Sequence, residues 1–80
     1  MNWKEPFERF AKYAANLALL DAENIDVEDL RRVNFTCNGE EYTIRMWNIR
    51  GDVITDYTLY KMLPGQGGKT IYNCGNYELR

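Results

Sequence analysis

The first twenty residues place apolar side chains at the spacing of one helix face. At 100° per residue that face consists of Trp3, Phe7, Phe10, Ala14, Leu17 and Ala18, and it is extended by Tyr13 and Leu20. Charged residues fill the opposite side, and Pro6 fits only within a first helical turn. The pattern therefore predicts an amphipathic helix from about Asn2 to Leu20.

From residue 33 onward, apolar and polar residues alternate with the period of a strand. Asn38-Gly39 separates two such runs, and this dipeptide favours a two-residue hairpin turn with positive φ at both positions. A two-residue turn pairs Phe35 with Tyr42, and the apolar side chains of both runs then share one face. We therefore predict two antiparallel strands joined at Asn38-Gly39.

Gly51 marks a second turn, and a third strand is predicted from Val53 to about Met62. Two registers fit the pattern: Ile54 opposes Trp47 in one and Ile49 in the other. Both registers give the same two faces. The core side is expected to hold Tyr42, Ile44, Met46, Val53, Thr55, Tyr57 and Leu59. The outer side is expected to hold Arg45, Trp47, Ile49, Ile54, Asp56 and Tyr60.

The remainder is a glycine-rich loop over residues 63–68, a short strand from Lys69 to Cys74, and a fifth piece from Tyr77 to Leu79 after a turn at Gly75-Asn76. No linker or repeat divides the 80 residues, so a single domain is expected over residues 1–80. The predicted fold is α+β, with the N-terminal helix packed on one face of a three- to five-stranded antiparallel β-meander.

An acidic segment joins the helix to the strands. It contains Asp21, Glu23, Asp26, Glu28 and Asp29 and no basic residue. Asp26 is placed to cap a short helical turn, and capping together with solvation is one explanation of the segment. The alternative is that these carboxylates occupy a basic groove on a partner, which makes the segment a secondary candidate site.

Composition limits the classes of partner. The net charge is -2, which argues against nucleic acid because its binding requires a strong positive field. No run of residues is long and apolar enough to span a membrane, and the N-terminus lacks the pattern of a signal peptide. We therefore expect a cytoplasmic protein that does not bind membranes and whose thiols are reduced.

The sequence offers no arrangement for catalysis. It contains no histidine, the commonest general base and metal ligand, so no enzyme activity, metal or cofactor is expected. Gly68-Lys69-Thr70 resembles the end of a phosphate-binding loop, but Leu63 stands where the first glycine is required. Cys37 and Cys74 are expected to be free thiols, and only closure of the sheet would bring them close enough to form a disulfide.

The outer face of the sheet is the best candidate site. The predicted helix covers one face, which leaves the other without a cover. Its members Arg45, Trp47, Ile49, Ile54 and Tyr60 have the aromatic and arginine composition of a protein interface. The alternative is that the C-terminal segment, with Tyr72 and Tyr77, folds over this face and makes it core.

These features predict a non-catalytic protein-binding module, an inhibitor or adaptor that occupies a functional surface of another protein. In general character the chain is similar to the small inhibitors that phages make against host defence, anti-CRISPR proteins among them, although no motif is shared with them. The alternative function is binding of single-stranded nucleic acid by stacking on the outer face.

Overall fold

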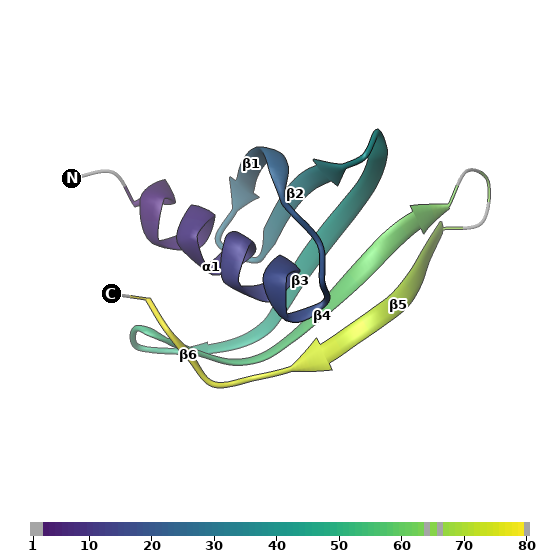
Figure 1. Ribbon diagram of the computed structural model, residues 1–80. Helices are drawn as coiled ribbons and strands as arrows, with labels where there is room; N and C mark the ends of the chain where they lie inside the picture. Colours follow the sequence, from purple (N-terminus) through teal and green to yellow (C-terminus); the bar gives the residue numbers. More distant parts are fainter. Residues whose placement is uncertain (1–2, 64, 66, 80) are drawn as a thin grey trace.

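The computed structural model contains one helix followed by six strands (Figure 1). It describes residues 3–63, 65 and 67–79, without the side chains of residues 73 and 74. The elements are α1 (Lys4–Leu17), β1 (Glu23–Asp29), β2 (Arg32–Cys37), β3 (Glu40–Arg50), β4 (Val53–Leu63), β5 (Gly67–Cys74) and β6 (Tyr77–Glu78).

The strands form an antiparallel meander in the order β1-β2-β3-β4-β5, and β6 pairs with β4. The predicted α+β class and antiparallel meander are confirmed. The predicted hairpin at Asn38-Gly39 is present, with Phe35 opposite Tyr42. Of the two registers considered for the next hairpin, the one that opposes Ile49 and Ile54 is correct. In the described part of the chain β1 and β5 are opposite edges, so the sheet is open.

The acidic segment forms an edge strand, so the predicted helical turn at Asp26 is wrong. Val27 is buried and pairs with Val33 of β2, whereas the acidic side chains are exposed. Val27 and the partly buried Ile25 pack against the hydrophobic cluster, and the carboxylates face water. Charged side chains on an edge strand also hinder pairing with another chain.

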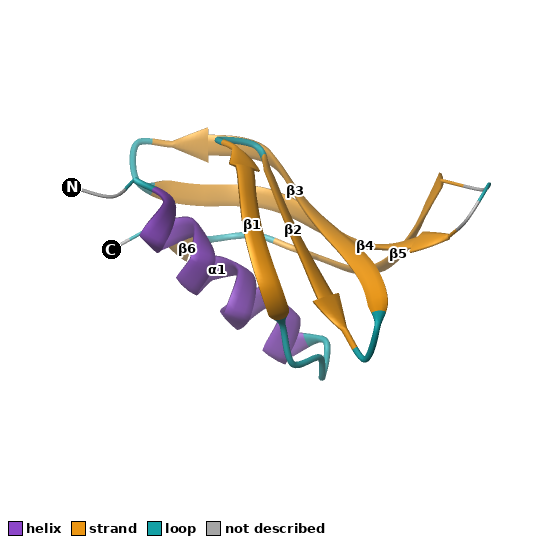
Figure 2. Ribbon diagram, turned by 90° about the horizontal axis from the view of Figure 1, so that it is seen from above, coloured by secondary structure: helices purple, strands orange, loops and turns teal. Residues whose placement is uncertain are grey.

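The buried side chains of α1 join those of one sheet face in a single hydrophobic cluster. We call this face, which carries Val33, Phe35, Ile44, Tyr57 and Leu59, the inner face. The helix contributes Phe7, Phe10, Ala11, Ala14 and Ala15. The Phe10 ring meets that of Tyr57 edge-on, with centroids 4.9 Å apart, and that of Tyr77 at 5.1 Å. Figure 2 shows α1 running alongside the strands of the sheet.

The buried stripe of α1 differs from the predicted one at its margins. Leu17 is 42% exposed, so the expectation that this member of the apolar face is buried is wrong, and Trp3 on the same predicted face is 47% exposed. Ala11 and Ala15 are fully buried instead. A stripe centred on small alanines lets the helix backbone approach its neighbours closely, and this rotates the larger Leu17 towards solvent.

Two opposed bulges interrupt the long hairpin of β3 and β4. Met46 pairs with Tyr57 and Asn48 with Asp56, which leaves Trp47 as an extra residue in β3. Ile49 then pairs with Ile54, which leaves Thr55 as an extra residue in β4. Each bulge shifts the alternation of side chains by one residue. Because both strands contain one extra residue, the pairs beyond the bulges return to the original register. Their side chains, however, point to the opposite face from the one that regular alternation would give.

The chain does not reverse at Gly75-Asn76, as a turn there would require. β5 and β6 both pair antiparallel with β4, so β6 continues in the direction of β5 after a short interruption. Gly75 lies against the bulge of β4, where a Cβ atom would overlap the backbone carbonyl of Thr55. Glycine at this position allows the two backbones to approach.

Truncation of Phe10 to alanine is expected to destabilise the domain by about 3–5 kcal/mol, because it removes a fully buried ring and leaves a cavity. Chemical denaturation of the variant measures this loss. Leu17→Ala is the matched control on the same helix, and it should cost less than about 1 kcal/mol because Leu17 is partly exposed. Equal losses from the two variants would contradict the assignment of the buried stripe.

Candidate functional site

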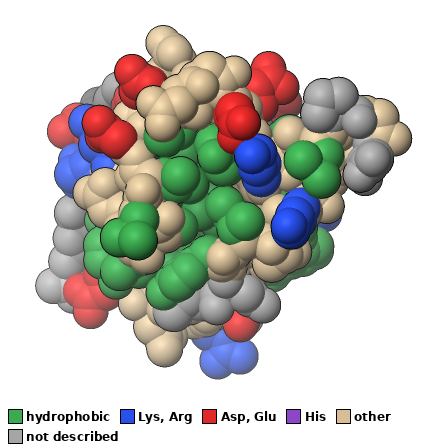
Figure 3. Space-filling model, turned by 45° about the vertical axis from the view of Figure 1, so that its right-hand side comes forward, with side chains coloured by type: hydrophobic (Ala, Val, Ile, Leu, Met, Phe, Trp, Pro, Cys, Tyr) green, Lys and Arg blue, Asp and Glu red, His purple; other side chains and the backbone are tan. Residues whose placement is uncertain are grey.

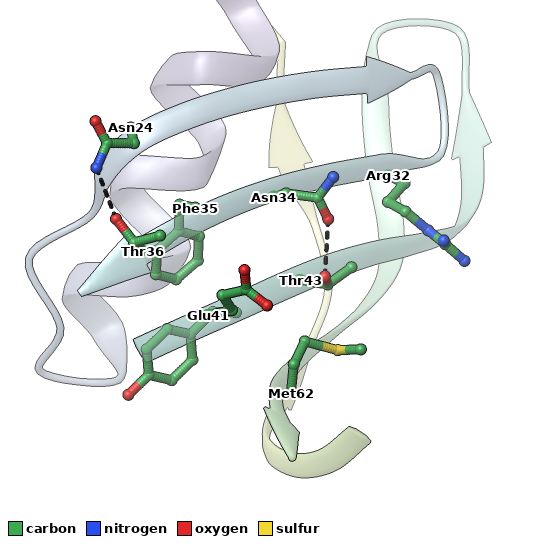
Figure 4. A pocket seen from close by; sticks show the side chains of 9 residues that line it. Asn24, Arg32, Asn34, Phe35, Thr36, Glu41, Thr43 and Met62 are labelled. Carbon is green, nitrogen blue, oxygen red and sulfur yellow. Dashed lines mark hydrogen bonds between the residues drawn. The ribbon is translucent and has the colours of Figure 1, made fainter. Parts of the chain in front are cut away.

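The outer face of the sheet, turned away from the cluster with α1, carries side chains in cross-strand rows. One row contains Asn34, Thr43, Tyr60 and Thr70, and the next contains Arg32, Arg45 and Thr58. Thr43 donates a hydrogen bond to Oδ1 of Asn34 at 2.8 Å, and Asn24 donates one to Thr36 at 2.9 Å (Figure 4). These hydrogen bonds link β1, β2 and β3. The row that contains Arg32 and Arg45 lies next to the Asn34–Thr43 pair.

Arg45 and Trp47 form a stack on this face. The Arg45 guanidinium carbon lies 4.4 Å from the centroid of the Trp47 ring, a cation–π arrangement. The indole Nε1 of Trp47 donates a hydrogen bond of 2.8 Å to Thr58 Oγ1, which fixes the ring over the buried threonine. The Trp47 side chain nevertheless remains 47% exposed. The stack is therefore an ordered aromatic and cationic surface that faces solvent.

A shallow groove of about 200 Å³ lies next to the stack. It is lined by Arg32, Thr43, Arg45, Tyr60, Met62 and Gly68. Met62 is 41% exposed, and Gly68 lies against the ring of Tyr60, so the floor is partly apolar. The two arginines are opposite each other on β2 and β3. The groove thus combines the side chains of two arginines with an apolar wall.

The outer-face set predicted from sequence is only partly correct. Arg45 and Trp47 are exposed on this face, and Tyr60 is half-buried in the groove. Ile54 is fully buried and Ile49 packs against the hydrophobic cluster, so placing these two residues on the outer face was wrong. The bulges at Trp47 and Thr55 cause the difference, because strict alternation holds only for a regular strand.

Arg32 and Met62 belong to the same surface but were missed from the sequence. Arg32 lies at the start of β2, where a helical turn was predicted to precede it, so its face was not assigned. Figure 4 shows Arg32 and Met62 on strands that flank β3, which carries Thr43 between them. The predicted hairpin at Asn38-Gly39 already placed residue 32 opposite residue 45, and extending that ladder by one pair would have identified Arg32.

The C-terminal segment does not cover the outer face within the described residues. Tyr77 lies on the rings of Phe10 and Tyr13, with centroids 5.1 Å and 4.8 Å apart, and Tyr72 packs against the hydrophobic cluster. Both tyrosines therefore belong to the inner side. The alternative in which they make the outer face part of the core is wrong, and Trp47 keeps its exposed surface.

Apolar side chains are also exposed elsewhere on the molecule. Figure 3 shows hydrophobic side chains gathered at the centre of one face, with acidic and basic side chains around them. Tyr13 and Leu17 of α1 are 44% and 42% exposed. The exposure of Leu17 was not predicted, because the sequence pattern placed it on the apolar face of the helix. The exposed Tyr13 and Leu17 make the helix side a rival to the outer face as a contact surface.

The structure places most of the predicted acidic site on β1, at the exposed edge of the sheet. Glu23, Asp26, Glu28 and Asp29 are exposed on β1, and Asp21 is exposed just before it. Glu28 Oε2 lies 3.6 Å from Nε of Arg32, and Asp29 accepts a hydrogen bond from the backbone N–H of Arg31. Local pairing and protection of a sheet edge explain these residues without a partner.

The cysteines and the paired acids Glu40 and Glu41 are the remaining candidate reactive side chains. Cys37 is a buried free thiol, and the side chain of Cys74 lies outside the described residues. Glu40 and Glu41 diverge: Glu40 contacts Lys61 and Tyr42, whereas Glu41 lines an outer groove. No group of three potential metal ligands occurs among the described residues.

Comparison with known proteins gives no further guide to function. No protein-family model matches the chain, and no match is found among curated proteins or solved structures. Within the described residues, no helix has the length and apolar character needed to cross a membrane. The surfaces of the molecule are therefore the only basis for a functional proposal.

The ion pair between Glu40 and Lys61, 2.6 Å apart, should make the stability of the hairpin ends depend on pH. The hydrogen bond and charge of Lys61 lower the pKa of Glu40. A lowered folded-state pKa adds stability above the unfolded pKa, and this stability is lost as the pH falls through the folded value. We expect an NMR titration of Glu40 to show a lowered pKa that rises towards its usual range in Lys61→Met. An unchanged pKa in that variant would contradict the pairing.

Proposed function

We propose that this chain is a non-catalytic protein-binding module, an inhibitor or adaptor that contacts its partner through the outer sheet face. The observation that carries the proposal is the Arg45–Trp47 stack, an ordered aromatic and cationic pair that remains exposed. Tryptophan and arginine are the residues most enriched at the energetic centres of protein interfaces. Its activity would be to block the partner's functional surface, as an inhibitor, or to link the partner to another protein, as an adaptor.

The fixed geometry of the stack supports binding of a partner. The hydrogen bond from Trp47 to Thr58 holds the ring, and the ring in turn supports the Arg45 guanidinium. Side chains that are already ordered lose little conformational entropy when a partner covers them. Met62, an exposed apolar side chain in the groove that Arg45 also lines, extends the area available for contact. An unoccupied surface of this kind would favour aggregation, which a partner prevents.

The balance of charge favours protein over nucleic acid as the partner. Stacking of bases on Trp47 is chemically reasonable, but single-stranded nucleic acid also requires a continuous basic track. Arg32 and Arg45 are the cations of the groove; Glu28 lies 3.6 Å from Arg32, and Glu41 lines a neighbouring groove that Arg32 also lines. A run of phosphates would meet these carboxylates. A protein surface of mixed charge does not face this repulsion.

Substitution of Trp47 by alanine tests the proposal. We expect Trp47→Ala to weaken binding to the captured partner by about 2 kcal/mol or more, as for an interface centre, while the domain stays folded. The partner is isolated from a host lysate with the wild-type chain, and its affinity for the wild type and the variants is then measured by calorimetry. Circular dichroism and thermal melting establish that each variant is folded.

Trp3→Ala is the matched control. Trp3 has the same exposed fraction as Trp47, 47%, but precedes α1 and contacts Phe7. Its loss should leave affinity unchanged. If Leu17→Ala removes binding instead, the partner uses the helix side. If reversing the charges of Asp26, Glu28 and Asp29 removes binding while Trp47→Ala does not, the acidic edge is the interface. Either result would refute the outer face as the contact surface.

A further inference from the structure

The cross-strand pair of Arg32 and Arg45 is unusual because it places two like charges directly opposite each other. Side chains at such positions have Cβ atoms about 4.5–5.5 Å apart, and like charges there destabilise a sheet. The nearby Glu28 is 3.6 Å from Arg32 and offsets part of this repulsion. Among the described residues Arg45 forms no ion pair, and its guanidinium lies over the Trp47 ring. Arg45 thus carries a positive charge that no carboxylate among the described residues neutralises.

From this arrangement we propose that Arg32 and Arg45 form a carboxylate-binding site, and that its occupant is a glutamate or aspartate side chain of the partner protein. The proposal rests on the proposed function and names the chemistry that the outer face recognises. The cation–π contact with Trp47 holds the Arg45 guanidinium without a hydrogen-bond acceptor, so its N–H donors are left for a carboxylate. Arg32 supplies a second set of donors from the neighbouring strand.

The walls of the groove specify what surrounds the carboxylate. Tyr60 and Thr43 add hydroxyl groups, and Met62 supplies an exposed apolar wall beside them. An acidic side chain flanked by apolar residues fits this lining. A volume of about 200 Å³ accommodates one side chain rather than a folded segment.

The carboxylates around the site determine the charge of the occupant. Glu28 lies beside Arg32, and Glu41 lies on the same face in a neighbouring groove that Arg32 also lines. Two cations flanked by anions attract a single negative charge and repel a chain of them. Basic residues next to the partner's acidic side chain would instead be attracted by the carboxylates of Glu28 and Glu41. The site therefore fits an isolated acidic residue within a neutral or basic surface.

An NMR titration of the full 80-residue chain with short peptides tests the site. The probe is the peptide acetyl-Lys-Leu-Glu-Leu-Lys-amide, and its control carries glutamine in place of glutamate. We expect the glutamate peptide to shift the Nε–H resonances of Arg32 and Arg45 in a saturable way and to bind at least tenfold more tightly than the glutamine peptide. Added salt should weaken the binding, because it screens the charges.

Variants separate a binding role from a structural one. Arg45→Gln should reduce affinity for the glutamate peptide at least tenfold, and Arg45→Lys should reduce it less, because lysine keeps the charge but loses the planar fork. Arg32→Gln should also weaken binding without lowering the melting temperature, since it removes a repulsive pair. Arg9→Gln is the matched control: Arg9 lies on α1 and already pairs with Glu5. Its binding should be unchanged.

Three results would overturn the proposal. Equal affinity for the glutamate and glutamine peptides would show that no carboxylate is recognised. A lower melting temperature for Arg32→Gln with unchanged binding would assign that residue a structural role. Tighter binding of a ten-residue oligothymidylate than of the peptide would identify nucleic acid as the occupant. The two peptides could have equal affinity while Trp47→Ala still weakens binding to the captured partner. In that case the carboxylate site is wrong and the proposed interface stands.

Discussion

The opposed bulges at Trp47 and Thr55 are the feature on which both faces of the sheet depend. A regular ladder would keep Trp47, Ile49 and Ile54 on one face. The extra residue in each strand sends the isoleucines into the cluster with α1 and leaves Trp47 on the outer face. The same irregularity in β4 meets Gly75, where only glycine lets the C-terminal segment pass close to the Thr55 carbonyl. The pair of bulges thus determines which of these side chains are buried and which are exposed.

This arrangement reconciles stability with an exposed tryptophan in a small domain. A chain of 80 residues buries little surface and requires its large apolar side chains in the core. Ile54 is fully buried and Ile49 packs against the same cluster. Trp47, which donates a hydrogen bond to Thr58 and contacts Arg45, is a large side chain that stays exposed on the outer face. Its ordered exposure is what favours a binding role over simple packing.

Much of the fold could be predicted from the sequence because strong local signals specify it. The Asn38-Gly39 turn set the register of β2 and β3 without ambiguity, and that register also places Arg32 opposite Arg45. β1 was missed because its carboxylates suggest a loop, whereas burial of Val27 decides the structure. The bulges could not be predicted, since alternation alone contains no sign of an extra residue. Two of the five proposed site residues were misplaced for that reason.

Cross-strand NOEs in the β3–β4 hairpin test the account most directly, because they report the pairing of individual residues. The account predicts contacts between the backbones of Met46 and Tyr57 and between those of Ile49 and Ile54, with Trp47 and Thr55 lacking a direct partner. It also predicts a contact between the Trp47 indole N–H and Thr58. A regular ladder in which Trp47 pairs with Ile54 would contradict it, because both isoleucines would then return to the outer face.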